Sequence, residues 1–133
     1  MSEAEWQTRV PHDGRTVGVV AHHVASVYPI EIHLASEIAA GKSIEGVTWA
    51  VIAEMNAKHS VDNGTPTKQE TIDLLRQNSK VAADAVRKFS DEQLDRATNV
   101  SLYGDAPLTA QFFIEDHALR HSWHHMAIVK AGL

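Results

Sequence analysis

Four of the chain's nine histidines fall within residues 116–129, DHALRHSWHHMAIV. They are His117, His121, His124 and His125. Apolar side chains are interleaved with them, so the segment is typical of a folded helix rather than of a terminal histidine run. Imidazole nitrogens bind Zn, Ni, Cu or Fe, and imidazole also carries protons near neutral pH. The segment therefore indicates a metal site, with proton transfer as a second use of the same residue type.

Helical geometry shows which of these histidines share a face. Successive residues of a helix are about 100° apart, which places His121 in the middle of a face that Ile114 and Ile128 make apolar. His117 and His125 lie one turn to either side, so each forms a His-x-x-x-His pair with His121. The spacing alone does not decide between the two pairs.

A second helix adds one more inward histidine. In residues 16–40, a stripe of valine, leucine and isoleucine defines a buried face, and His23 lies close to it while His22 points outward. Glu31 also faces inward, where a carboxylate needs a partner or a cavity. Three buried imidazoles need hydrogen-bond partners, and one divalent ion satisfies all three. Three protein ligands also leave a coordination position open for water or substrate.

Simpler interpretations of these histidines explain the pattern less well than a metal site does. A single inward histidine is usually a hydrogen-bonded core residue, and one His-x-x-x-His pair occurs by chance, but inward histidines on two helices favour a shared ion. A di-iron bundle would need Glu-x-x-His motifs, and the chain has none. Ser26 and Ser122 lie near histidines without the elbow motif of a nucleophilic serine. No haem motif is present.

The elements that position these residues are helical almost throughout. We expect one all-α domain over 1–133, a bundle joined by modest loops. Thr67-Lys68-Gln69-Glu70 has the form of a capping box, and residues 90–93 repeat it. The expected elements are a short arm over 1–13, helices over 16–40, 47–60, from 67 onward and over 107–130 with Pro107 in the first turn, and a loop or short extended piece over 98–105.

Composition limits the partners and the compartment. The formal net charge is −5, which argues against nucleic acid and anionic membranes because both favour basic surfaces. The absence of cysteine rules out disulfides and thiolate ligands, and it makes the cytoplasm the simplest location. No apolar run approaches the roughly 20 residues that span a membrane.

Two segments resemble the DinB/YfiT-like family of metal-binding four-helix bundles: TVGVVAHHVASVYP at 16–29 and HSWHHMAIVK at 121–130. The resemblance implies His23, His121 and His125 as metal ligands, and it favours His125 over His117. TWAVIAEMNAKH followed by TKQETIDLL is similar to the mycothiol-dependent maleylpyruvate isomerase branch. One departure is that too few residues precede Thr16 for the family's leading helix. The helix at 47–60 or a neighbouring subunit would then complete the bundle.

The resemblance implies a metal, zinc first with nickel or iron as alternatives, whose open position activates water or a low-molecular-weight thiol. The expected function is a thiol-dependent transferase or isomerase acting on a small molecule, and relatives also include hydrolases. His124 or His117 would move a proton, and Glu31 would serve as an acid–base or supporting group. The alternatives are a non-catalytic protein that binds a metal or small ligand, and a structural, self-associating bundle.

The last helix also predicts self-association. Phe112, Leu119, Trp123 and Met126 lie well away from its histidine face. A large apolar patch rarely stays exposed on a monomer, and a two-fold dimer covers such a patch with its own copy. We therefore expect a homodimer with Trp123 in its interface.

Overall fold

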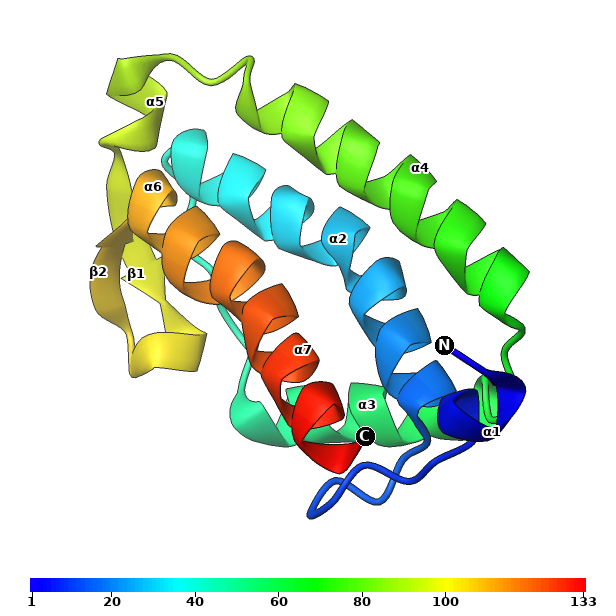
Figure 1. Ribbon diagram of the computed structural model, residues 1–133. Helices are drawn as coiled ribbons and strands as arrows, with labels where there is room; N and C mark the ends of the chain where they lie inside the picture. The colour runs from blue at the N-terminus through cyan, green and yellow to red at the C-terminus, as the bar shows by residue number, and fades with distance from the viewer.

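Three long helical segments lie side by side in the computed structural model, which describes residues 1–133 (Figure 1). The central helix is α2 (Val17–Ala39), with α4 (Lys68–Val86) on one side of it. On the other side runs a continuous segment made of α6 (Ala110–Phe113), a π-helical segment (Ile114–Leu119) and α7 (Arg120–Gly132). α3 (Trp49–Asp62) crosses the N-terminal part of α2 instead of running beside it along its length (Figure 1). It does not take the place of a fourth long helix.

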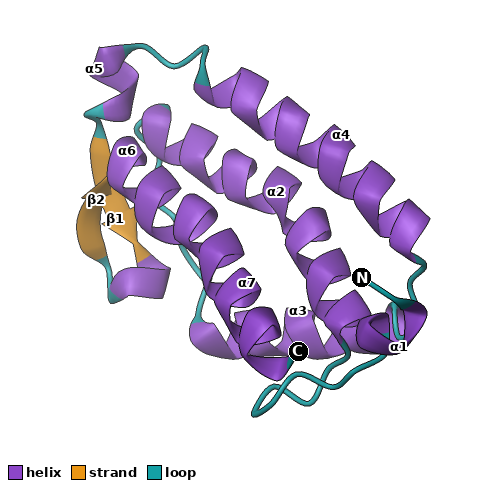
Figure 2. Ribbon diagram, in the orientation of Figure 1, coloured by secondary structure: helices purple, strands orange, loops and turns teal.

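The predicted all-α bundle is confirmed, with one small addition. Figure 2 shows a two-stranded sheet beside the helices, in which β1 (Ala97–Val100) pairs antiparallel with β2 (Ala106–Thr109). A 3-10 turn over Ser101–Tyr103 joins the strands. The short helix α5 (Asp91–Leu94) precedes them. No helix has both the length and the apolar character needed to span a bilayer.

Side-chain caps begin three of the helices, and two of these caps are the predicted capping boxes. The Thr16 side chain accepts a hydrogen bond from the Val19 backbone at the start of α2. Capping boxes begin α4 at Thr67 and α5 at Ser90. Such caps satisfy backbone N–H groups that have no partner inside the helix, so these boundaries depend on local sequence alone.

The predicted start of the last helix at Pro107 is wrong. Pro107 lies in β2 opposite Asn99, and Thr109 caps the helix by accepting a hydrogen bond from Phe112 N at 3.1 Å. Proline suits the first turn of a helix, but it is also tolerated in edge strands. Pairing with β1, which is distant in sequence, decides between these uses.

The N-terminal residues are not a free arm. Residues Glu3–Trp6 form α1, and the Trp6 ring is buried against Val10, Val17 and Val20. Its indole N–H donates to the Pro66 carbonyl at 2.8 Å. A Cβ atom at Gly18 would lie 2.5 Å from the Trp6 ring nitrogen, so glycine is required there for the ring to pack.

The main hydrophobic core lies at the C-terminal end of α2. Ile38, Val100 and Phe113 are fully buried where α2, the sheet and α6 meet. Only 20 of 133 residues are buried, and neither α3 nor α7 contributes one. The N-terminal half of α2 packs on Trp6 and Val10 through Val17 and Val20. Its buried His23 meets the half-buried histidines of α7.

Candidate metal centre

Three of the predicted histidines meet between α2 and α7. The Nε2 atom of His121 lies 3.1 Å from Nε2 of His23 and 3.1 Å from Nε2 of His125. One ligand nitrogen from each residue fits within a span of 4.8 Å. His23 is buried on α2, while His121 and His125 are half-buried one turn apart on α7. Together they form a group that could hold a metal ion.

Hydrogen bonding alone cannot satisfy this convergence. A ring nitrogen of neutral imidazole either donates one proton or accepts through one lone pair. The single Nε2 of His121 therefore cannot make a full hydrogen bond to both neighbours. A cation shared by the three lone pairs would satisfy all three Nε2 atoms at once, so the donor set fits a divalent ion that prefers imidazole, such as zinc.

The surroundings keep these imidazoles neutral. Burial, followed by the neighbouring histidines His121 and His125, lowers the pKa of His23 to about 3. Burial also lowers the pKa of His121 to about 3 and that of His125 to about 4. A neutral ring keeps the lone pair that metal binding requires, so the group is ready to bind at neutral pH.

Glu31 faces the Nδ1 side of the His121 ring, whereas His23 and His125 face its Nε2 side. Its side chain is 4% exposed, and its Oε1 lies 3.6 Å from Nδ1 of both His117 and His121. These distances exceed a direct hydrogen bond. Burial raises the pKa of Glu31, and His117 acts in the opposite direction. The carboxylate favours a proton on Nδ1 of His121, which leaves Nε2 free as a ligand.

His117 is turned away from the group. Its ring stacks nearly parallel to Phe113, with centroids 5.1 Å apart, and its Nδ1 faces Glu31. His117 belongs to the π-helical segment, whereas His121 and His125 belong to α7. A π-helical turn contains more residues than an α-turn, so the predicted symmetry of His117 and His125 about His121 is lost.

His124 is exposed on α7, with its ring centroid 5.4 Å from that of His125. It is not one of the three residues whose ring nitrogens converge. Its assignment to proton transfer remains a prediction.

The sequence did not reveal His59. This residue lies in the last turn of α3, and its Nε2 is 2.9 Å from Nδ1 of His22. Its ring also meets the edge of the His23 ring, with centroids 5.5 Å apart. His22 lies outside the three-histidine group, as expected, but it is half-buried beside His59. No periodicity could show this, because it depends on α3 crossing α2.

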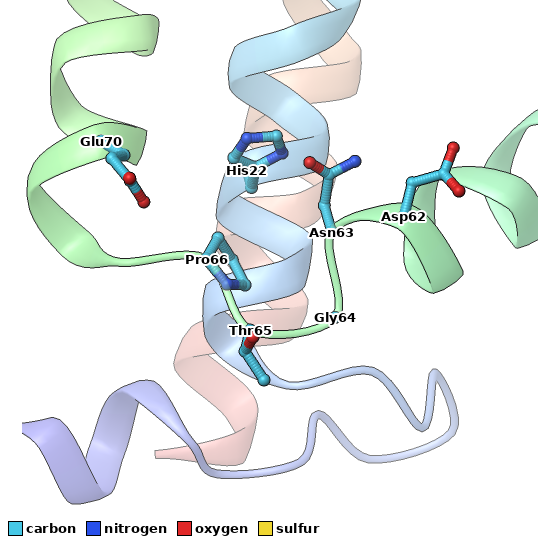
Figure 3. Close-up of a pocket in the computed structure, with 7 residues that line it drawn as sticks. All are labelled: His22, Asp62, Asn63, Gly64, Thr65, Pro66 and Glu70. Atoms are coloured by element: carbon cyan, nitrogen blue, oxygen red, sulfur yellow. The ribbon is translucent and has the colours of Figure 1, made fainter.

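A polar pocket of about 190 Å³ opens beside His22 (Figure 3). The loop that joins α3 to α4 forms much of its wall, and Figure 3 shows Glu70 on the opposite side of His22 from Asp62. The Glu70 carboxylate is already bound to Thr67 in the capping box. None of the three converging histidines lines this pocket.

The fold and the site together define a helical bundle whose centre is a three-histidine group able to hold a divalent cation. The family model of the DinB superfamily matches residues 1–129. The chain therefore belongs to the DinB superfamily. Searches of curated proteins and of solved structures found no match.

Proposed function

We propose that the protein is a metal-dependent enzyme whose divalent ion is held by His23, His121 and His125. The carrying observation is the convergence of three Nε2 atoms, with both short distances at 3.1 Å. Zinc is the expected metal, and nickel and iron suit the same donors. When bound, such an ion supplies Lewis acidity at a position left open by three protein ligands.

The proposed chemistry is thiol-dependent transfer or isomerisation of a small molecule. It rests on the similarity of TWAVIAEMNAKH and TKQETIDLL to the mycothiol-dependent isomerase branch. In this proposal Glu31 keeps the proton on Nδ1 of His121, and His124 exchanges protons with solvent beside the site. His117 contacts Glu31 and helps to hold that carboxylate in place.

A thiol assay tests the activity directly. Because the chain has no cysteine, a thiol-specific dye reports only the added thiol. Glutathione, cysteine and a mycothiol analogue are incubated with 1-chloro-2,4-dinitrobenzene and zinc-loaded protein. We expect thiol consumption above the uncatalysed rate with at least one thiol, and its loss after chelation. For isomerisation, a cis-dicarboxylic substrate is followed by absorbance, and the thiol should not be consumed. Identical rates with loaded and chelated protein in both assays would contradict the proposal.

A closed, non-catalytic metal site is the alternative that one observation favours. His59 touches the His23 ring, and its Nδ1 is buried without a partner. If His59 moved to become a fourth ligand, no open position would remain. The His59→Ala variant distinguishes the open site from the closed site. An open three-histidine site should keep its metal in this variant, whereas a closed four-histidine site should lose metal affinity, as expected for His121→Ala.

Glu31→Gln is expected to weaken zinc binding about 10–100-fold, which is the usual cost of removing a group that supports a metal ligand. The substitution keeps the shape of the side chain but removes the charge that orients His121. Competition with a fluorescent zinc chelator measures the affinity. Glu37→Gln, on the same helix and paired with Lys42 at the surface, is the matched control. Equal affinities for the two variants would show that Glu31 does not support the site.

We also propose that the protein is a homodimer. Trp123 is 68% exposed on α7, and Phe112, Leu119 and Met126 are exposed along the same helical segment. Aromatic side chains at the centre of an interface often contribute more than about 2 kcal/mol. Trp123→Ala should therefore raise the dimer dissociation constant by about 30-fold or more, as measured by sedimentation equilibrium.

Trp49 provides the control for this measurement. It is 66% exposed on α3, away from the proposed interface, so Trp49→Ala should leave the dimer intact. A wild-type mass of 14.6 kDa at micromolar concentration would reject the dimer without affecting the metal site. Equal weakening by both substitutions would place the interface elsewhere.

A further inference from the structure

A second cavity, of about 390 Å³, lies between α2, α4 and the π-helical segment. None of the three converging histidines lines it. Nine of its twelve lining residues are hydrophobic, including Ile32, Val86 and Ile114. Its volume falls in the range of about 300–1,000 Å³ that is usual for small-molecule sites. Its apolar wall suits a hydrocarbon group.

One acidic side chain is built into this apolar wall. Glu31 lines the cavity, is 4% exposed, and its Oε1 has no hydrogen-bond partner. The nearest donors are the two Nδ1 atoms at 3.6 Å, which is too far for a full hydrogen bond. A buried carboxylate without a partner is costly. A donor supplied by a ligand in the cavity would reduce that cost.

The remaining polar groups of the wall do not favour an acidic ligand. Arg87 is the cation of the cavity wall, but it forms an ion pair with Asp84 at 3.0 Å and its side chain is 73% exposed. The Tyr28 hydroxyl is within hydrogen-bond distance of Ser122 Oγ at 3.1 Å. Among the residues of the cavity wall, the buried side-chain atom without a partner is Glu31 Oε1, a hydrogen-bond acceptor with acidic character.

We infer that this cavity binds a small apolar molecule that carries an amine. The amine lies against Glu31, and the hydrocarbon part lies along Ile32, Val86 and Ile114. Charge-assisted hydrogen bonds to carboxylates are the stronger kind, so the amine determines selectivity while the apolar wall contributes affinity. This ligand site shares Glu31 with the surroundings of the metal centre, but it does not depend on the activity proposed for that centre.

Three probes of equal chain length test the selectivity: n-octylamine, 1-octanol and octanoate. Their binding to the full-length, zinc-loaded protein is measured by isothermal titration calorimetry. We expect saturable binding of octylamine, at least about 10-fold tighter than that of octanoate, with octanol in between. Glu31→Gln should abolish the preference for octylamine over octanol. Because Glu31 also contacts His121, the series is repeated on chelated protein, where the same preference is expected.

Filling the cavity gives a test that does not touch the metal site. Ala83→Trp introduces a large ring into the wall and should reduce octylamine binding at least about 10-fold. Val81→Trp, on an exposed position of the same helix, should leave it unchanged. The proposal is overturned if octanoate binds as tightly as octylamine, if Ala83→Trp binds octylamine normally, or if octylamine does not bind. A different outcome would be that the wild type is a dimer that does not bind octylamine, while the Ala83→Trp variant is a monomer. That outcome would overturn the proposal and indicate that a second copy of the chain occupies the cavity.

Discussion

Replacing His121 with alanine is expected to remove metal binding. Its Nε2 is the atom that lies within 3.1 Å of both other nitrogens, so His23 and His125 alone would form a two-ligand site. The loss should exceed the 10–100-fold that supporting residues contribute. Elemental analysis of protein purified without an affinity tag measures it, as the molar ratio of zinc to protein after gel filtration.

Two substitutions control for this result. His124→Ala removes an exposed histidine of the same helix, and His22→Ala removes the neighbour of His23. Both should retain the wild-type metal content. Circular dichroism checks that each variant is folded. If His121→Ala binds as much metal as the wild type, the three-histidine assignment is wrong.

Removing the metal is expected to lower the melting temperature substantially. An ion that binds mainly the folded state adds RT ln(1 + [L]/Kd) to the free energy of unfolding, about 2.7 kcal/mol at a free concentration of about 100 Kd. For a domain of this size, that corresponds to a decrease of roughly 10 °C. The stabilised region is the contact between the N-terminal half of α2 and α7, to which α7 contributes no fully buried residue.

Differential scanning calorimetry with and without a chelator measures this change. The His121→Ala variant should melt at one temperature under both conditions, which separates metal loss from other effects of the chelator. A metal-containing wild type whose melting temperature does not move after complete chelation would show that the ion is not linked to folding.

Local sequence determined where several helices begin. Thr67 and Ser90 cap helices as predicted, and α2 begins beside Thr16 as expected, because a cap needs only a side chain and the backbone two or three residues further on. The helical periodicity of the apolar residues placed His23 and His121 on inward faces, because an apolar stripe shows which side of a helix is buried. The resemblance in residues 16–29 and 121–130 indicated the superfamily that the family model shows.

Packing between distant segments decided the rest. Pairing with β1 drew Pro107 into a strand, and the His59–His22 contact exists because α3 crosses α2. Spacing made His117 and His125 equivalent partners of His121, since the 100° rule assumes a regular α-helix. The π-helical segment breaks that regularity and turns His117 toward Phe113 and Glu31, while His125 stays in register with His121. Helical periodicity does not reveal such an irregular turn, so it could not choose His125 over His117. The family resemblance favoured His125, and the tertiary structure brings it together with His23 and His121.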